Sequence, residues 1–272
     1  MKIGFIGAGN MAEAIIKGIV KNGTDPKDVY ISDIDRGKVE ALAGACGVNV
    51  AGGNLEIMEK CKFIILAVKP NLMKPVIGEI KHLLSCEKHI LVSIAAGMSL
   101  EKLEGFADMP EVPVIRVMPN VNSAICMGMT AICKNSFVEQ GAYEYIKGLF
   151  EKTGKIAELE ESFFPLFGAL AGSSPAFSYL FIESLAKCAH KVGMPKALAV
   201  EIAAQTVLGS AALILASGKH PWELIDSVCS PGGTTIEGIC TLEREGFPAA
   251  IVSCLDACMA KDNIIAGREK SK

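Results

Sequence analysis

The chain has 272 residues, a length that suits one large domain or two smaller ones. Half of its residues are apolar and the formal net charge is −3, so the chain can build a sizeable core and carries no polybasic footprint. We therefore expect a small-molecule substrate, and neither a nucleic acid nor a membrane as partner.

The first 160 residues alternate between short apolar runs and amphipathic segments. Continuous apolar runs predict strands buried on both faces, and apolar residues three to four apart predict helices. The expected strands are residues 2–7, 29–33, 48–51, 62–70, 89–97, 112–120, 129–133 and 155–160, and the expected helices are residues 10–23, 36–47, 73–84 and 138–154. This order predicts an α/β fold with an N-terminal Rossmann-type doubly wound sheet over residues 1–160.

The pattern changes after Phe163, because no convincing strand follows and every segment has helical spacing. We expect an all-helical C-terminal domain over residues 161–272. Within it, residues 197–217 are almost entirely apolar, with Glu201 and Gln205 as the strongly polar breaks. A stretch of this length could span a membrane, but the breaks and the small residues favour a helix buried in protein. A domain this small cannot cover it alone, so we expect a subunit interface to help.

A glycine-rich turn joins the first strand to the first helix. In Gly7-x-Gly9-x-x-Ala12, the first glycine permits the tight turn, the second lets the backbone approach a pyrophosphate, and Ala12 allows close packing of helix and strand. The helix N-terminus adds unpaired N–H groups and the positive end of a dipole. The alternative is a plain tight turn. The expected cofactor contacts of this turn are Gly7, Ala8, Gly9, Asn10, Met11 and Ala12.

The second strand ends in acidic and basic residues that bear on the choice of cofactor. Asp33 or Asp35 favours the ribose hydroxyls of NAD(H), whereas Arg36 and Lys38 favour the 2′-phosphate of NADP(H). Either acid could instead cap the following helix. Both cofactors therefore remain open.

Two later strand ends should line the same edge of the sheet, because ligands of such sheets bind beyond the carboxyl ends of the strands. Lys69 by itself is better explained as an ordinary solvated lysine, and its place before Pro70 at a strand end makes a functional role an equal alternative. The expected contacts there are Ala67, Val68, Lys69, Pro70, Ala95, Ala96 and Gly97, and Asn54 and Asn120 complete the cofactor set.

The ten cysteines include no Cys-x-x-Cys pair, and the four histidines are scattered. The chain opens directly into a strand-like run, so we expect a cytoplasmic protein with reduced thiols and no structural metal.

Six motifs in order along the chain resemble the pyrroline-5-carboxylate reductase family: "FIGAGNMAEAI", "AVKP", "SIAAG", "RVMPN", "GSSPAF" and "CSPGGTTIEGI…LEREGF". The resemblance implies reduction of 1-pyrroline-5-carboxylate to L-proline by NADPH or NADH, the last step of proline biosynthesis. It also implies a homodimer through the helical domain, often assembled into a larger ring such as a decamer. The chain departs from the family pattern at Val121 and Asn122, where Thr-Pro is common, and at Asp33, where a neutral residue would better suit a 2′-phosphate.

A second glycine turn, "SPGGTT", lies in the helical part and begins at Ser230. A helix N-terminus can hold a substrate carboxylate, and the resemblance supports this use. The alternative is a simple N-cap by Ser230 or Thr234. The expected substrate contacts are Ser230, Gly232, Gly233, Thr234 and Thr235, and Thr235 is the expected catalytic residue at the ring nitrogen. Because a hydroxyl is a poor acid, Thr235 would orient the ring or relay a proton.

"GSSPAF" at 172–177 predicts a helix start with Ser174 as N-cap and Pro175 as the first helical residue, and such a helix start can also face the pocket. Two other functions remain as alternatives: a 3-hydroxyacid dehydrogenase, which would use a lysine of the helical domain, and a nucleotide sensor without turnover. The dehydrogenase reading leaves "SPGGTT" unexplained, and the intact second turn disfavours the sensor.

Overall fold

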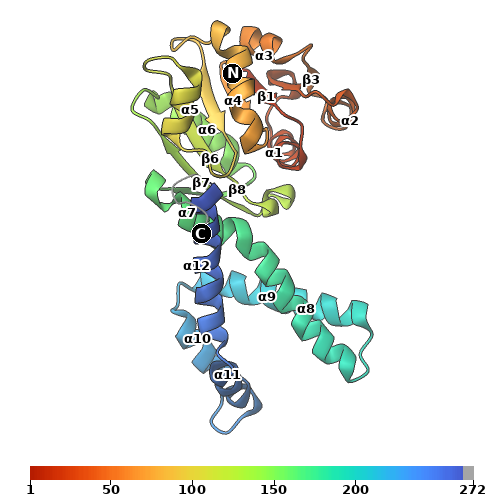
Figure 1. Ribbon diagram of the computed structural model, residues 1–272. Helices are drawn as coiled ribbons and strands as arrows, with labels where there is room; N and C mark the ends of the chain where they lie inside the picture. Colours follow the sequence, from red (N-terminus) through yellow and green to blue (C-terminus); the bar gives the residue numbers. More distant parts are fainter. Residues whose placement is uncertain (266–272) are drawn as a thin grey trace. The chain divides into compact units, whose positions relative to one another are not determined.

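The computed structural model describes residues 1–265 (Figure 1). The chain divides into two compact units, one formed by Met1–Gly172 with the C-terminal segment from Met259, and one formed by Ser173–Cys258. The division expected after residue 160 stays a prediction, since the residues just beyond it still pack on the first unit. Phe164 and Phe167, for example, are buried against Met118 and Ala131.

The first unit is built on one eight-stranded sheet. Its strand order is β3-β2-β1-β4-β5-β6-β7-β8, which is the Rossmann order extended by two strands. The strands are β1 Ile3–Ile6, β2 Val29–Ser32, β3 Asn49–Val50, β4 Phe63–Leu66, β5 Ile90–Ser93, β6 Val114–Met118, β7 Gly128–Lys134 and β8 Gly154–Glu158. The predicted strands are confirmed, and the continuously apolar runs of β1, β4 and β5 are fully buried as expected.

Helices cover both faces of this sheet. One face is packed by α1, α2 and α6, and the other by α3, α4 and α5. Their bounds are α1 Asn10–Lys21, α2 Arg36–Cys46, α3 Asn54–Lys60, α4 Pro70–Ile80, α5 Leu100–Ala107 and α6 Gln140–Glu151, with short 3₁₀ turns at Pro26–Asp28, Lys81–Leu83, Val121–Ile125 and Glu161–Phe163. The doubly wound fold is therefore confirmed, whereas α3 and α5 were not expected.

Strand β7 reverses the direction of the sheet. It pairs antiparallel with β6 and parallel with β8, while β1 to β6 are parallel. The link between β6 and β7 contains only one 3₁₀ turn, which is too short for a parallel crossover.

The chain is helical without a break from Glu161 to Lys191. After the short helix α7, Phe164–Phe167, a π-helical turn at Gly168–Ser173 leads directly into α8, Ser174–Lys191. The predicted start of an α-helix at Ser174 is confirmed, but the predicted N-cap is wrong, because Ser173 is the N-cap of α8 and already belongs to the π-helical turn.

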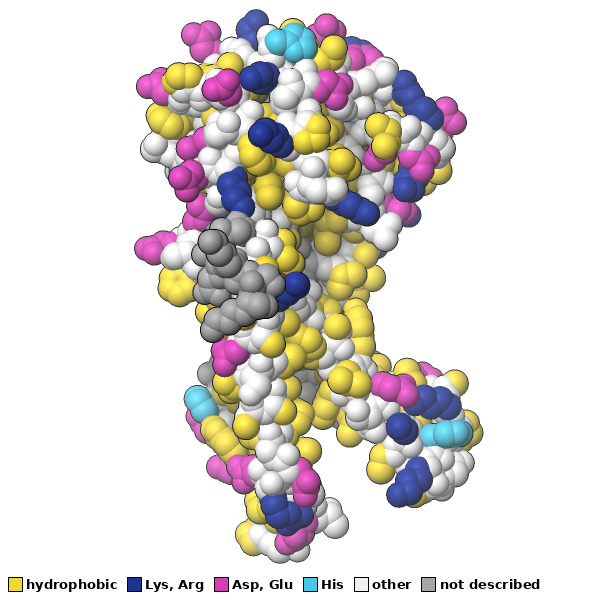
Figure 2. Space-filling view, in the orientation of Figure 1, with side chains coloured by type: hydrophobic (Ala, Val, Ile, Leu, Met, Phe, Trp, Pro, Cys, Tyr) yellow, Lys and Arg dark blue, Asp and Glu magenta, His cyan; other side chains and the backbone are white. Residues whose placement is uncertain are grey.

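The second unit is made of helices: α8, α9 Lys196–Ser217, α10 Pro221–Val228, α11 Thr234–Arg244 and the larger part of α12 Phe247–Ile265. Helices α8 and α9 pack side by side. Of α9, only Ala199 and Ala203 are buried, and Leu215 is 87% exposed. Figure 2 shows hydrophobic side chains along these helices. A single chain therefore leaves apolar surface uncovered that water does not favour.

Two described helical stretches, Glu161–Lys191 and Lys196–Ser217, are long and apolar enough to cross a membrane if length and composition alone are considered. Core helices and helices at subunit interfaces meet the same criteria.

Candidate active site

The first glycine turn is built into the sheet. Gly7 adopts φ +109°, and its N–H donates to the Ser32 carbonyl at 2.7 Å. A Cβ at this position would lie 2.6 Å from the backbone oxygen of Ala67. Residue 7 must therefore be glycine for both its conformation and its surroundings.

Gly9 serves a different purpose, since a Cβ built there would meet nothing within 4 Å. Gly9 is the N-cap of α1, and no side chain of the described residues caps this helix. The first N–H groups of α1 thus remain open beside a position without a side chain, while Ala12 is buried against the sheet. These residues fit a dinucleotide pyrophosphate.

Asp33 connects the end of β2 to the glycine turn. Its Oδ2 accepts from the Ala8 N–H at 2.7 Å, and its Oδ1 accepts from the Asp35 N–H at 2.9 Å. Asp35 caps α2 through the Lys38 N–H, so the capping alternative holds for Asp35 and not for Asp33. Arg36 is directed to the next loop, where its guanidinium donates to the Ala51 and Gly52 carbonyls.

Asn54 lies at the start of α3. Its Oδ1 accepts from the Ser32 hydroxyl at 3.0 Å, and its Nδ2 donates to Glu79 at 2.8 Å. Asn54 is therefore held between β2 and α4, at the same strand end as Asp33.

The expected loops after β4 and β5 meet at the edge that carries the glycine turn, because β1, β4 and β5 pair in register. Lys69 is the exposed N-cap of α4, with Pro70 as the first helical residue. Gly97 adopts φ +71° in the loop that follows β5. The structure thus places residues 67–70 and 95–97 at one edge of the sheet with residues 7–12.

Asn120 is buried after β6, and its side chain links three parts of the first unit. Its Oδ1 accepts from the Met129 N–H at 3.1 Å, and its Nδ2 donates to the Ala171 carbonyl of the π-helical turn at 3.0 Å. Asn120 therefore fixes the loop after β6, and its expected contact to the cofactor stays a prediction.

The second glycine turn is a type II turn with Pro231 and Gly232 at its centre. Gly232 adopts φ +66°, and the Gly233 N–H donates to the Ser230 carbonyl at 3.0 Å. Gly233 is the N-cap of α11, with no cap from a described side chain. The alternative of a helix capped by Ser230 or Thr234 is therefore wrong. The N–H groups at the start of α11 remain open, except that of Gly233, which the turn uses.

Thr235 lines a hollow of about 360 Å³ within the helical unit. Most of its lining is apolar, including Leu213, Ile214 and Ile239, so Thr235 brings one of few hydroxyl groups to it. Cys229 lines the same hollow.

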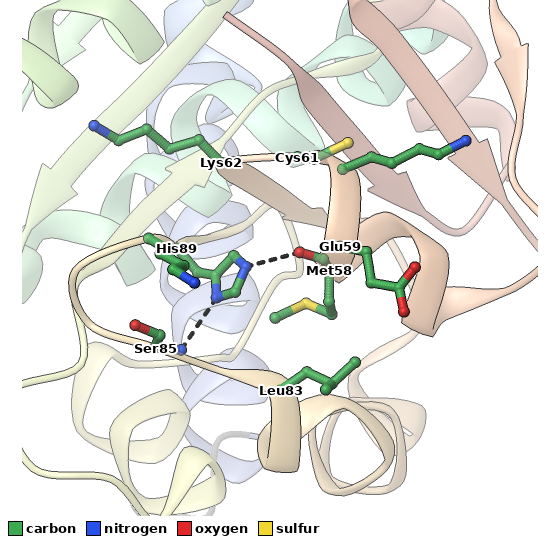
Figure 3. Close-up of a pocket in the computed structure, with 9 residues that line it drawn as sticks. Met58, Glu59, Cys61, Lys62, Leu83, Ser85 and His89 are labelled. Atoms are coloured by element: carbon green, nitrogen blue, oxygen red, sulfur yellow. Dashed lines mark hydrogen bonds between the residues drawn. The ribbon is translucent and has the colours of Figure 1, made fainter.

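A separate pocket of about 420 Å³ lies before the starts of β4 and β5, at the edge opposite the glycine turn (Figure 3). Buried His89 accepts from the Ser85 N–H through Nδ1, and its Nε2 faces the Met58 carbonyl at 2.8 Å. Burial lowers the pKa of His89 and raises that of Cys61 in the same pocket to about 12. Both side chains are therefore neutral, and the pocket belongs to the framework of the first unit.

All ten cysteines are free, and they all lie within the described residues. In residues 1–265, no group of three or more His, Cys, Asp or Glu side chains is arranged to hold a metal ion.

The fold and the open glycine turn define a nicotinamide-dependent oxidoreductase. Residues 2–97 match the family described as NADP oxidoreductase coenzyme F420-dependent, and residues 161–264 match pyrroline-5-carboxylate reductase dimerisation. Pyrroline-5-carboxylate reductase of Escherichia coli is 39% identical over 261 residues, which cover 96% of each chain. The chain belongs to the pyrroline-5-carboxylate reductase family.

Two solved structures agree with this membership. The 1-pyrroline-5-carboxylate reductase of Streptococcus pyogenes is 40% identical, with a TM-score of 0.86 over 96% of this chain and 98% of that one. The Plasmodium falciparum pyrroline carboxylate reductase, solved with NADP bound, is 28% identical, with a TM-score of 0.87 over 98% of both chains. The helical unit is thus a homo-oligomerisation domain, which accounts for the apolar surface that one chain leaves exposed.

Proposed function

We propose that this protein reduces 1-pyrroline-5-carboxylate to L-proline with NADH or NADPH, the last step of proline biosynthesis. The observation that carries the proposal is the uncapped start of α11 behind the turn at Ser230–Gly233. The turn offers the Ser230 and Thr234 hydroxyl groups, yet neither caps α11, so the first N–H groups of this helix are left for a ligand. The substrate brings a carboxylate, the ligand that such open N–H groups favour.

The carboxylate grip is formed by the backbone at the start of α11. The Thr234 and Thr235 N–H groups point along the helix axis away from its body, and the Ser230 hydroxyl lies next to Gly233, where a Cβ of that residue would be. Gly232 and Gly233 shape the turn, and neither brings a side chain that would block a ligand.

Thr235 orients the ring nitrogen through its hydroxyl. This group is too weak an acid to protonate an imine, so the substrate binds as the protonated iminium or receives its proton by relay. The reduced nicotinamide, when bound, supplies the hydride. The contribution of this chain is to hold the ring in one orientation, which lowers the entropic part of the barrier.

The cofactor contacts that we propose all belong to the first unit. Residues 7–12 hold the pyrophosphate, Asp33 and Asn54 lie on the ribose side, and residues 67–70 and 95–97 line the nicotinamide side. Asn120 positions the loop that follows β6.

The assembly that we propose is a cytoplasmic homodimer. Residues 161–272 form the helical dimerisation domain, and residues 1–160 form the dinucleotide-binding domain. The dimers assemble further into a larger ring such as a decamer. The exposed apolar faces of α9 support self-association over membrane insertion, because Glu201 and Gln205 interrupt them. The net charge of −3 gives no support for nucleic acid as a partner.

The test is oxidation of NADH and NADPH by the purified protein, followed at the nicotinamide absorbance, with and without 1-pyrroline-5-carboxylate. We expect oxidation that depends on the imine and yields one proline per cofactor oxidised. A chain with Thr235→Val is the matched control for a contaminating reductase. Cofactor binding without oxidation would favour the sensor, and oxidation with a 3-hydroxyacid or its keto acid instead would favour the dehydrogenase.

A further inference from the structure

We infer that the cofactor site selects NADH over NADPH and that Asp33 makes this choice. The inference deepens the proposed function and rests on it only for the identity of the site. It is drawn from the hydrogen bonds that fix the charged side chains at the end of β2.

The position of the Asp33 carboxylate is fixed by two backbone donors. The Ala8 N–H holds Oδ2 and the Asp35 N–H holds Oδ1, at 2.7 and 2.9 Å. Because Ala8 lies between Gly7 and Gly9, this hydrogen bond places the negative charge of Asp33 directly beside the first glycine turn. Each carboxylate oxygen retains capacity for a further donor, which is what a ribose hydroxyl offers. A 2′-phosphate offers acceptor oxygens and negative charge, and would be repelled there.

Arg36, the cation that could receive a 2′-phosphate, is already engaged. Nη1 donates to the Ala51 carbonyl at 3.0 Å and Nη2 donates to the Gly52 carbonyl at 2.8 Å. The same loop is held from its other side, where Glu56 accepts from the Gly52 N–H. These two bonds direct the guanidinium toward the Ala51–Gly52 loop and Glu56, so a phosphate would have only its remaining N–H groups or would have to compete with both carbonyls.

Lys38 does not fill this role either. Its ammonium lies 3.5 Å from the Asp35 carboxylate, one turn along α2. Ile34, between the two acids, is 98% exposed and brings no charge. The end of β2 thus presents a fixed carboxylate, while its two cations are paired elsewhere.

The experiment measures cofactor binding directly, by titrating the full chain with NADH and with NADPH and following the nicotinamide fluorescence without imine. We expect NADH to bind at least about tenfold more tightly than NADPH. Asp33→Asn should reduce this ratio at least about tenfold, chiefly by tightening NADPH, because it removes the charge and keeps an acceptor for the Ala8 N–H. Glu40→Gln is the matched control, since it removes an equal charge from an exposed position on α2 and should leave the ratio within about threefold.

Arg36→Ala separates the two roles of that residue. If Arg36 supports the Ala51–Gly52 loop, its loss weakens NADH and NADPH to the same extent. A selective loss of NADPH binding would overturn the inference, as would equal or tighter NADPH binding by the unaltered chain, or an Asp33→Asn chain with an unchanged ratio. Thermal unfolding of each variant shows whether it is folded, and Asp33→Ser is the second variant if Asp33→Asn is not.

The outcome is independent of the reaction. A chain that selects NADH but does not oxidise it with 1-pyrroline-5-carboxylate would keep this inference and lose the proposed function. A chain that turns over the imine equally well with both cofactors, and binds both equally, would do the reverse.

Discussion

The two glycine turns of this chain look alike as sequence and differ in what holds them. Gly7 lies at the end of a fully buried strand, and the backbone of Ala67 leaves no room for a Cβ. Gly233 lies on the exposed helical unit, and the atoms that a Cβ would meet belong to Ser230, chiefly its hydroxyl group. Rigid backbone surrounds the first turn, whereas a rotatable side chain adjoins the second.

This difference predicts which property of the protein a substitution in each turn should change. The first unit buries its apolar residues between sheet and helices, so it is complete within one chain. The helical unit buries little by itself and depends on association. Damage at the first turn should therefore cost folding, and damage at the second should cost substrate binding or assembly.

The largest effect is expected for Gly7→Ala. The added methyl group meets the Ala67 carbonyl at 2.6 Å, and φ +109° is strained for alanine, which together should lower the free energy of unfolding by roughly 2–5 kcal/mol. Denaturant unfolding measures the change. Gly9→Ala is the matched control, since its Cβ meets nothing; it should keep its stability and lose cofactor affinity. Equal stability of the two variants would contradict this account.

Leu208→Glu should disrupt assembly without unfolding the first unit. Leu208 lies in α9 and is 47% exposed in one chain, so a partner that covers it would bury an unpaired carboxylate at a cost of about 3 kcal/mol. Light scattering after size exclusion should show a smaller species. Leu55→Glu, on α3 of the first unit and 39% exposed, is the matched control and should retain the assembly. An unchanged mass for Leu208→Glu would place α9 outside the interface.

Thr235→Val should lower kcat about 100-fold, because it keeps the shape of the side chain and removes the hydroxyl that orients the ring. Direct titration should show unchanged cofactor affinity, since Thr235 belongs to the second turn. Thr235→Ser should restore most of the turnover. If the valine variant turned over normally, Thr235 would have no role at the ring nitrogen.

Gly233→Ala should raise the KM for the imine about tenfold and leave the unfolding free energy within about 0.5 kcal/mol. The new methyl group displaces the Ser230 hydroxyl, which can rotate, so the fold accommodates it while the carboxylate grip changes. Steady-state kinetics and thermal unfolding test the two halves of this statement. A loss of stability as large as that of Gly7→Ala would remove the distinction between the turns.

The centre of the sheet was predictable from the sequence because strands β1, β4, β5 and β6 are buried on both faces. Phe63–Leu66, for example, lies in a short continuous apolar run that ends before Lys69 and Pro70, whereas the apolar runs of α9 belong to a much longer segment. Helices α3 and α5 were missed because seven or eight residues carry too few turns to show a period. The π-helical turn before Ser174 was missed because its residues have no distinctive composition.

The candidate site was predictable where the chemistry is local. The spacing of Gly7 and Gly9 indicates a dinucleotide turn by itself. The hydrogen-bond partners of Arg36 lie 15 and 16 residues away in the sequence, and those of Asn120 lie 9 and 51 residues away. These hydrogen bonds could therefore not be predicted from the sequence without the fold. The uncapped start of α11 likewise depends on the turn geometry, since the sequence offers Ser230 and Thr234 as equally good caps.

The smallest expected effect is on the pH dependence of stability, and it comes from His89 at the edge of the first unit opposite its glycine turn. The Ser85 N–H donates to Nδ1 of His89, so a second proton on the ring would face a donor, and burial also holds the pKa of His89 below its usual value. In the unfolded chain the ring is protonated as the pH falls through about 6.5, whereas in the folded chain burial shifts this protonation to lower pH. The unfolded state then binds more protons, so stability decreases as the pH falls from 7.5 to 5.5.

His89→Gln keeps a donor and an acceptor but does not titrate, and should flatten this part of the pH dependence. The matched control is His82→Gln, at an exposed position, which should leave the slope unchanged. Because this contact lies wholly within the first unit, the effect should also persist in the Leu208→Glu background; its disappearance there would mean that assembly, and not the core of one chain, sets the stability of the first unit.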